Sequence, residues 1–490
     1  MEMRNLLSGV KRSFNLLDKK SKRKLLRITI IQSLLSLLDL AAVMLIGLIG
    51  ALAVLGVQSN TSYINYIVKF LRLETLEFQT QIMLLASSAA GLLLSKTLLS
   101  AYVVWKTTRY YSFLAAEIST GLIEKFLKQT IDKIYLNSSQ RNLYNLCSGI
   151  SIIVVGVISS ISSLISDLVL ILLMLITLFV SNPEMATLTF IVFTSAAVIL
   201  HYIVGVKSRT LAETLVPLNI KSSQSILNSI EGYREIFVSN SMNKRIENIS
   251  ELLRNTAKLT SKQAFLPYIS KYFIEIVLVF SIALFSFVQI SLTNAVQSAS
   301  ALALFIAASS RIAPAALRVQ QGISSVMNGY GAGKVSLELH ELLQMESIEP
   351  LITKARTSDS LVKSTKKEVP VVLLKDVHFG YEKNKIILNG INFEVMRGQN
   401  VLILGKSGRG KSTLLDLILG LVIPNQGTVE LFGESPRTAI ESGKNRISLV
   451  SQRPFIFEGT LFDNICDGDS KYTIKAIRDA LRFVDMLEFA

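Results

Sequence analysis

Long apolar stretches constrain the fold of this chain more than any other feature of its sequence. Between Ile276 and Ser310 no charged residue occurs, and half of the 490 residues are hydrophobic. A run of ~20 predominantly apolar residues is long enough to cross a bilayer as one α-helix. Because the polar piece Gln289 to Ser298 divides the last long run in two, we expect six transmembrane helices. The predicted spans lie near residues 28–57, 81–105, 146–180, 185–206, 268–289 and 297–318.

The charge distribution predicts the orientation of these spans. The net charge is +15, and basic residues gather in segments 1–27, 106–145 and 207–264, whereas the opposite loops are short and not basic. Basic loops stay in the cytoplasm, and an even number of spans returns the chain to its starting side. We therefore expect a multi-pass protein of the plasma (inner) membrane, with both the N-terminus and the C-terminal region in the cytoplasm. No basic stripe is interleaved with aromatic residues, so nucleic acid is not an expected partner.

A phosphate-binding pattern is the second constraint. The pattern G-x-x-x-x-G-K-[ST] is matched at every fixed position by Gly405-Lys406-Ser407-Gly408-Arg409-Gly410-Lys411-Ser412-Thr413. An apolar run precedes this loop and a helix-forming run follows it, as a strand-to-helix turn requires. The glycines let backbone N–H groups surround a phosphate, and the N-terminus of the following helix favours its negative charge. We expect Lys411 to bridge the β- and γ-phosphates of ATP and the Ser412 hydroxyl to ligate Mg²⁺.

These two constraints divide the chain into four parts. Residues 1–27 hold nine basic residues among Leu, Val and Phe, which is typical of an amphipathic helix at a membrane surface. Residues 28–340 carry the six spans and two long cytoplasmic excursions. Residues 341–370 are rich in Ser, Thr and Lys and predict a linker, and residues 371–490 form a partial nucleotide-binding domain. Strands are expected at 371–374, 391–395, 400–404, 428–432 and 446–450, and a helix at 473–489.

Two further motifs flank the phosphate loop. His378-Phe379-Gly380-Tyr381 lies before it, and the segment from Leu449 to Phe457, which contains Gln452, lies after it and continues to Thr460-Leu461-Phe462-Asp463-Asn464-Ile465. Together with the spans and the long cytoplasmic excursions, these motifs resemble the exporter-type half-transporters of the ATP-binding cassette (ABC) family, in which membrane and ATP-binding domains are fused. The resemblance extends over the whole chain.

The resemblance implies roles for individual residues. Tyr381 would stack on adenine, and Gln452 would contact Mg²⁺ and the attacking water. ATP hydrolysis in this family takes two nucleotide domains arranged head to tail, so the resemblance implies a homodimer or a heterodimer of half-transporters. ATP and Mg²⁺ are the implied cofactors. The implied cofactor-binding residues are Tyr381, Gly405, Lys406, Ser407, Gly408, Arg409, Gly410, Lys411, Ser412, Thr413 and Gln452, with Ser412 and Gln452 at the metal.

The chain departs from the family after the glutamine motif. No LSGGQ-type motif, no apolar strand ending in Asp-Glu and no switch histidine follow Lys411. We therefore expect a C-terminally truncated version of a longer protein, which binds ATP but has no catalytic residue for hydrolysing it. The alternative is a natural ATP-binding membrane regulator without turnover. The predicted fold class is a multi-domain membrane protein, with an all-α domain of six transmembrane helices followed by an incomplete α/β P-loop NTPase domain.

Charged residues inside the spans are the candidates for contact with a transported substrate, because a charge at a helix centre is costly. They are Asp39, Lys96, Asp167, Glu275, Arg311 and Arg318. Asp39 could pair with Lys96, and the side chains of Glu275 and Arg318 could reach the cytoplasmic surface. Arg311 is the preferred candidate for the substrate cavity, and a cation there would suit a phosphate-bearing lipid.

The membrane half also resembles bacterial lipid-linked oligosaccharide flippases. The similarity rests on Asp39 early in the first span, the segment from Ile230 to Ile236, and the last span running from Ala307 to Gln321. It implies an exporter that moves a lipid-linked or amphipathic substrate out of the cytoplasmic leaflet. Peptide or drug export remains an alternative.

Overall fold

The computed structural model contains two compact units. The helical unit comprises Met1–Gln129 and Lys133–Asp359, and the sheet unit comprises Thr130–Asp132 and Ser360–Ala490. Most of the predicted outer loop 58–80 and of the predicted linker 341–370 lies outside the described residues. The residues that the structure describes are 2–55, 78–181, 183–292, 295–346, 369–382, 385–442, 447–452, 454–466 and 472–489.

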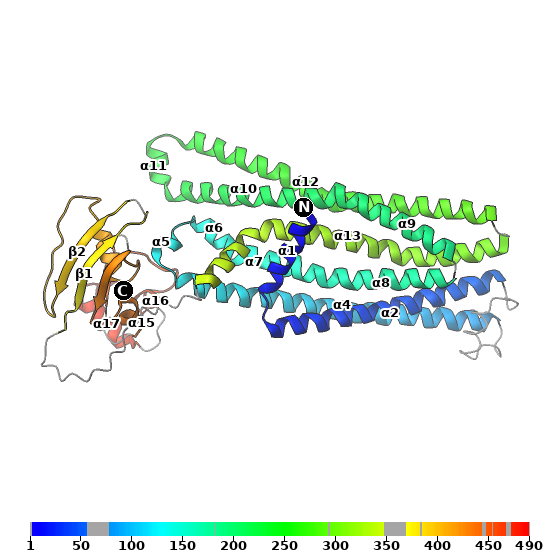
Figure 1. Cartoon of the computed structure of the whole chain (residues 1–490), viewed down its shortest axis with the longest axis horizontal. Coiled ribbons are helices and arrows are strands. Elements are labelled where there is room, and N and C mark those ends of the chain that lie inside the picture. The colour runs from blue at the N-terminus through cyan, green and yellow to red at the C-terminus, as the bar shows by residue number, and fades with distance from the viewer. Residues whose placement is uncertain are drawn as a thin grey trace. The chain divides into compact units, whose positions relative to one another are not determined.

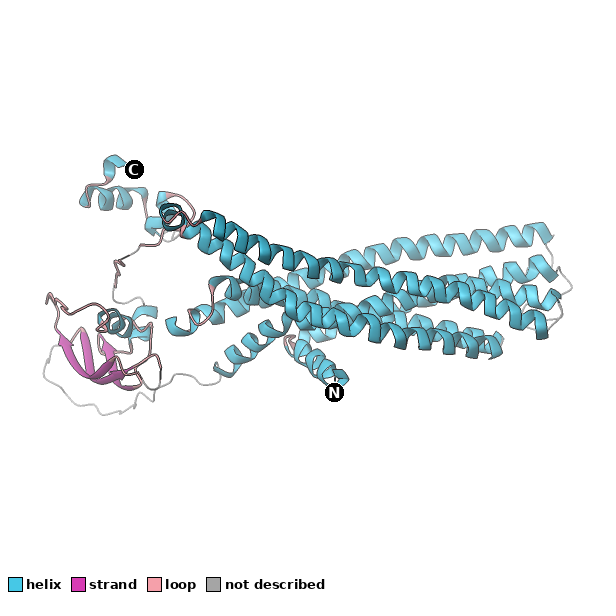
Figure 2. Cartoon of the chain, turned by 90° about the horizontal axis from the view of Figure 1, so that it is seen from above, coloured by secondary structure: helices cyan, strands magenta, loops and turns pink. Residues whose placement is uncertain are grey.

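Long helices form the helical unit and run lengthwise beside one another (Figure 1, Figure 2). Helix α13 packs against α2, α8, α10 and α12, and α2 also packs against α4 and α8. Helices suit these apolar segments because every backbone N–H and C=O inside a membrane must be paired within the segment itself. The long helices are α2 (Lys19–Leu55), α4 (Phe78–Leu127), α8 (Ser159–Ser181), α9 (Pro183–Leu200), α10 (Val206–Glu231), α12 (Met242–Leu292) and α13 (Ala295–Glu346).

Four helical stretches in the described part of the chain are long and apolar enough to cross a membrane. They are Met83–Leu127, Ser139–Val180, Ala186–Glu231 and Met242–Phe287. Each contains most or all of one predicted span. The other two predicted spans, 28–57 and 297–318, fall on α2 and α13, where many side chains lie outside the description. The total of six spans therefore remains a prediction.

Short helical segments connect the long ones. Several are π-helical turns within continuous helix, at the foot of α8 and at the junction of α9 with α10. They are α5 (Ile131–Ile134), α6 (Ser139–Leu143), η3 (Tyr144–Ser148), α7 (Gly149–Ser151), η4 (Ile152–Ile158), η5 (His201–Gly205) and α11 (Tyr233–Val238).

The N-terminal lead-in is a separate helix, α1 (Glu2–Asn15), that lies across the long helices (Figure 1). Asp18 caps the start of α2, because its carboxylate accepts a hydrogen bond of 2.8 Å from the Ser21 N–H. The predicted lead-in 1–27 thus divides into α1, a turn and the first turns of α2.

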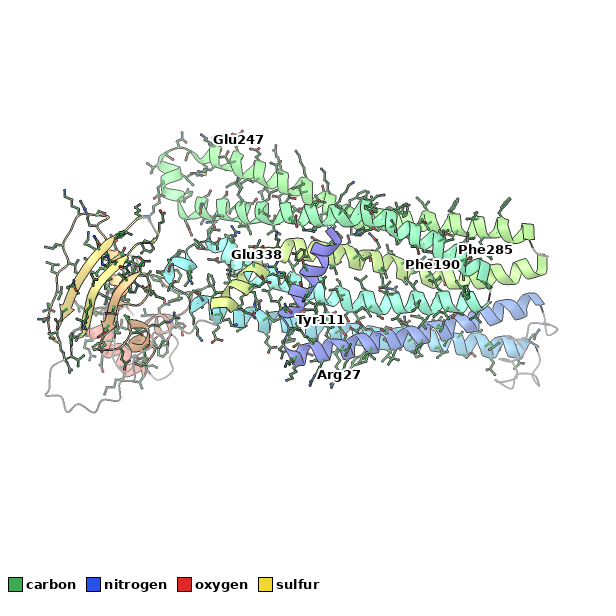
Figure 3. The ribbon with its side chains drawn as sticks, viewed as in Figure 1. Arg27, Tyr111, Phe190, Glu247, Phe285 and Glu338 are labelled. Atoms are coloured by element: carbon green, nitrogen blue, oxygen red, sulfur yellow. The ribbon has the colours of Figure 1, made fainter. Side chains whose placement is uncertain are left out.

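Two apolar clusters stabilise the helical unit at different levels along its length. Tyr111 and Leu337 belong to one cluster, in which α1 and α4 meet α13. Phe285 belongs to the other, where its ring stacks on Phe305 with 4.8 Å between the ring centroids. Tyr111 and Phe285 are both labelled in Figure 3. Stacked rings of this kind contribute about 1 kcal/mol beyond the burial of their area.

An antiparallel sheet of three strands forms the centre of the sheet unit (Figure 2). The strand order is β2-β1-β3, with Val372 opposite Val395 on one side and opposite Leu431 on the other. Its core joins Leu374, Val377 and Leu417. The elements are β1 (Val372–Phe379), β2 (Leu388–Val395), α14 (Lys411–Ile418), β3 (Gln426–Leu431), α15 (Pro436–Glu441), α16 (Leu461–Cys466), α17 (Ile474–Phe483) and η6 (Leu487–Phe489).

Two predicted strands are absent from the sheet. Residues 400–404 and 447–450 have no strand conformation, and the predicted strand 446–450 begins outside the described residues. The apolar side chains of Leu402 and Val450 are 79% and 95% exposed. A strand requires a hydrogen-bonded neighbour, and no described segment pairs with either of these two. The predicted helix 473–489 is also shorter, since α17 ends at Phe483 and a turn separates it from η6.

Candidate nucleotide-binding site

The phosphate loop connects an extended segment to helix α14, and glycine determines its shape. Gly408 and Gly410 have φ angles of 78° and 85°, in the left-handed region that glycine adopts without steric cost. A Cβ on Gly410 would lie 2.9 Å from Ile387 Cγ2, whereas one on Gly408 would have open space around it. Gly410 is therefore required both for its backbone conformation and for the close approach of the Ile387 and Leu388 side chains.

Lys411 closes the loop on itself. Its Nζ donates hydrogen bonds to the carbonyl oxygens of Gly405, at 2.8 Å, and Lys406, at 2.9 Å. The ammonium group thereby lies across the mouth of the loop, within reach of any anion bound there. Because these acceptors are neutral carbonyls, a phosphate would compete well for the same donor, as hydrogen bonds between charged groups are roughly twice as strong as neutral ones.

The loop fits a triphosphate. Its residues from Gly405 to Arg409 are exposed, and the first turn of α14 carries N–H groups that have no acceptor within the helix. Such groups, together with the positive end of the helix dipole, favour an anion. Ser412 is exposed at this turn and would offer its hydroxyl to Mg²⁺, whereas Thr413 is buried, which places it in the packing of α14.

Tyr381 lies beside the helix that follows the loop. The ring is 49% exposed and meets Phe379 edge to face, with 5.0 Å between centroids. Burial raises the pKa of the Asp416 carboxyl on α14, and the nearby Tyr381 hydroxyl opposes this shift. The backbone before Tyr381 is fixed by Asn425, which accepts a bond of 2.7 Å from the Gly380 N–H. The structure thus brings Tyr381 to the phosphate-loop helix.

Gln452 is exposed in a segment without regular structure, and no hydrogen bond joins it to the phosphate loop among the residues described. The apolar cluster around Leu374, Val377 and Leu417 has no member after Val429 in the described ranges. The expected strand before Gln452 is not formed, and the contact of Gln452 with Mg²⁺ stays a prediction. The end of the motif is ordered locally, since Thr460 caps α16 and its hydroxyl donates to the Asp463 carboxylate at 2.7 Å.

The sequence of this region matches a known family. The profile of the ABC transporter family matches residues 388–489, which include the phosphate loop, α14 and the glutamine motif. Residues 388–489 belong to the ABC transporter family. The chain is therefore a helical membrane protein whose C-terminal residues form an ABC ATPase region with a small sheet.

Individual ABC proteins are similar to part of this chain. One is the lacticin-481/lactococcin-DR transport/processing ATP-binding protein of Lactococcus lactis subsp. lactis, which is 39% identical over 119 residues, 24% of this chain and 16% of the relative. Another is the ATP-dependent lipid A-core flippase of Saccharophagus degradans, 37% identical over 120 residues, 24% of this chain and 20% of the relative. The mycobactin import ATP-binding/permease protein IrtB of Mycolicibacterium thermoresistibile is 37% identical over 114 residues, 23% of this chain and 20% of the relative. The matched regions thus span about a fifth of the length of these relatives or less.

Charged residues of the predicted spans form ion pairs between helices. Lys96 on α4 contacts Asp39 on α2 at 2.7 Å, which confirms the expected pairing. Arg318 on α13 donates to Asp167 on α8 at 2.8 Å, a partner that the sequence analysis did not propose. Glu275 lies 3.9 Å from Lys271 on the same helix. Arg311, the predicted cavity residue, lies on α13, and its side chain is outside the described residues.

Sequence reasoning missed the residues that support the site from a distance. Asn425 fixes the backbone before Tyr381, and Asp416 lies near the Tyr381 hydroxyl, yet neither residue belongs to a motif. An isolated acidic residue in the otherwise apolar run after Lys411 was the available signal for Asp416. The Arg318–Asp167 pair had a comparable signal, because both residues are isolated charges of opposite sign in two predicted spans.

Proposed function

We propose that this chain forms the membrane domain and part of the ATP-binding domain of an ABC exporter, which moves a lipid-linked or amphipathic substrate out of the cytoplasmic leaflet. The observation that carries the proposal is the ordered phosphate loop, with Lys411 across its mouth, in the same chain as a set of membrane-length apolar helices. Apolar helices of this length are not expected in a soluble NTPase. The likeness to a lipid A-core flippase supports a lipidic substrate, and Arg311 on α13 is the proposed cavity cation.

In the proposed mechanism ATP binding draws two copies of the nucleotide domain together. Tyr381 would contact the base, residues 405–413 the phosphates, and Ser412 and Gln452 the Mg²⁺ ion. The segments near 131–145 and 208–222 would transmit closure to the spans, in a homodimer or a heterodimer of half-transporters at the plasma (inner) membrane. Support for the first segment comes from Ile131, which folds within the sheet unit and whose N–H donates to the Leu421 carbonyl at 2.8 Å.

Nucleotide binding is the first test. Purified protein should bind a fluorescent ATP analogue with Mg²⁺, and Lys411→Ala should weaken binding at least tenfold because it removes the charged donor at the mouth of the loop. Lys375→Ala is the matched control, since Lys375 is an exposed lysine on β1 that lies outside the phosphate loop. Equal binding by the wild type and Lys411→Ala would overturn the assignment.

Hydrolysis separates the transporter from a regulator. We expect these 490 residues to bind ATP without turnover above background, because no apolar strand motif ending in Asp-Glu follows Lys411 in them. ATPase activity that Lys411→Ala abolishes would contradict this expectation.

The second candidate for the substrate, a peptide or drug, is supported by the likeness to the lacticin-481 transport protein. Vesicle uptake assays with a labelled lipid-linked glycan and a labelled peptide would distinguish the two classes.

A further inference from the structure

A groove of about 750 Å³ runs along the outside of the helical unit, lined by residues of α1, α2 and α8. Ligand sites commonly have volumes of ~300–1,000 Å³. The groove lies far from the phosphate loop in sequence and within one compact unit, and none of the residues already assigned to ATP or to substrate lines it. It therefore requires an explanation of its own.

Two parallel rows of apolar side chains form the walls of the groove. Helix α2 contributes Leu26, Ile30, Leu34 and Leu37, whose spacing of three or four residues places them on one helix face. Helix α8 contributes a row at intervals of four residues, which begins at Ile165. Leu26 and Leu34 are 60% and 56% exposed, so these walls face the surroundings of the protein. In a membrane those surroundings are hydrocarbon chains.

One end of the groove is cationic. Lys22 lines it there, and within the described residues this side chain makes no ion pair. The adjoining turn of α2 also carries Arg27, which Figure 3 shows on the outer side of the helix. Such a basic cluster next to a membrane helix attracts anionic lipid headgroups. Helix α1 lies across the bundle at this level, as an amphipathic helix at a membrane surface does.

The length of the groove matches the thickness of one lipid leaflet. From Lys22 to Leu37 the helix advances about 22 Å, at a rise of ~1.5 Å per residue. One leaflet contributes about 15 Å of hydrocarbon, and the remainder falls in the headgroup region. A molecule with a negative headgroup and a long acyl chain would therefore place its charge at Lys22 while its chain follows the α2 and α8 rows.

We propose that this groove binds one anionic phospholipid from the surrounding bilayer, with the phosphate at Lys22 and an acyl chain along the α2 and α8 rows. The apolar walls accept the acyl chain of any phospholipid, whereas the charge of Lys22 favours an anionic headgroup over a zwitterionic one, which has no net charge. The site is a lipid site of the membrane domain and does not depend on ATP binding.

Native mass spectrometry of the full chain tests the proposal. The protein is purified into mixed micelles that contain equal amounts of phosphatidylglycerol and phosphatidylcholine, and retained lipids are counted. We expect one phosphatidylglycerol to be retained in preference. Lys22→Gln should lower the ratio of retained phosphatidylglycerol to phosphatidylcholine roughly fivefold, because one basic side chain at the surface is removed. Ile30→Trp should fill the groove and reduce retention of both lipids.

Each variant has a control at the neighbouring position. Arg23→Gln removes the same charge at the same depth but outside the lining, and Ile31→Trp adds the same ring on another helix face. Both control variants should retain as much lipid as the wild type, with the same ratio of phosphatidylglycerol to phosphatidylcholine. All four positions are exposed on α2, and unchanged thermal unfolding in detergent will verify that each variant is folded. A wild-type ratio near one, or the same loss in a variant and its control, would overturn the proposal.

Discussion

At the scale of single residues, backbone conformation and local charge determine the phosphate loop. Lys411 is held by two carbonyls of its own loop, and Gly410 provides a left-handed turn at the start of α14. All of these contacts join residues within a stretch of nine. The loop could therefore be predicted from sequence, including the role of its glycines.

Gly410→Ala should destabilise the sheet unit more than Gly408→Ala. Both substitutions force a Cβ into a positive-φ conformation, which costs about 1–2 kcal/mol. Only the Gly410 variant adds a contact of 2.9 Å with Ile387, so its neighbours must also shift. Thermal unfolding of the two variants measures the difference. Equal melting temperatures would show that the close approach to Ile387 does not constrain the loop.

The Asp39–Lys96 pair predicts a second residue-scale effect. Lys96→Ala removes the cation that faces the Asp39 carboxylate, whose side chain is only 8% exposed, and breaking a buried pair typically costs about 3–5 kcal/mol. Lys128→Ala in the exposed Glu124 pair is the control and should change stability by about 0.5 kcal/mol or less. Unfolding in detergent compares the two. Similar small losses of stability in both variants would mean that water reaches Asp39.

At the scale of elements, α1 is joined to α13 by a fork of two hydrogen bonds. Arg12 Nε and one Nη each donate to the Glu341 carboxylate at 2.7 Å. A Cβ on Gly9 would lie 2.3 Å from the Tyr330 ring, so α1 also approaches α13 closely one turn earlier. The amphipathic pattern predicted a surface helix here, but it could not predict its partner more than 300 residues later.

This fork makes the attachment of α1 dependent on pH. The hydrogen bond from Arg12 lowers the pKa of the Glu341 carboxyl, with burial opposing it. Because the folded pKa lies below the unfolded value near 4.3, the stabilisation is complete above that value and is lost as the pH falls through the folded pKa. Limited proteolysis of α1 should show less protection in Glu341→Gln than in the wild type at pH 7. The difference should disappear in strong acid, and a pH-independent difference would refute the role of the carboxylate.

At the scale of the whole molecule, the number of membrane crossings determines on which side the ATP site lies. Four helical stretches meet the length and composition for crossing, and two more spans are predicted on α2 and α13. Six crossings place the lead-in and the nucleotide-binding region on one side, whereas an odd number would separate them. The position of the ATP site relative to cellular ATP thus depends on this number.

Cysteine labelling tests the topology. After Cys147 and Cys466 are replaced by serine, single cysteines at Ser8 and Ser442 should both react with an impermeant reagent applied from the cytoplasmic side only. A cysteine at Ser59, in the predicted outer loop, should react from the opposite side. Labelling of Ser8 and Ser442 from different sides would exclude six spans.

The sequence by itself determined the features that are local along the chain. A phosphate loop and an apolar helix are both specified by neighbouring residues, so their identity and position could be predicted without a structure. Tertiary structure decided what depends on distant partners: the pairing of Arg318 with Asp167, the hydrogen bond from the Gly380 N–H to Asn425, and the failure of 400–404 and 447–450 to become strands. Ion pairs and strands form only when the fold supplies a second group, and the apolar pattern of one segment does not contain that information.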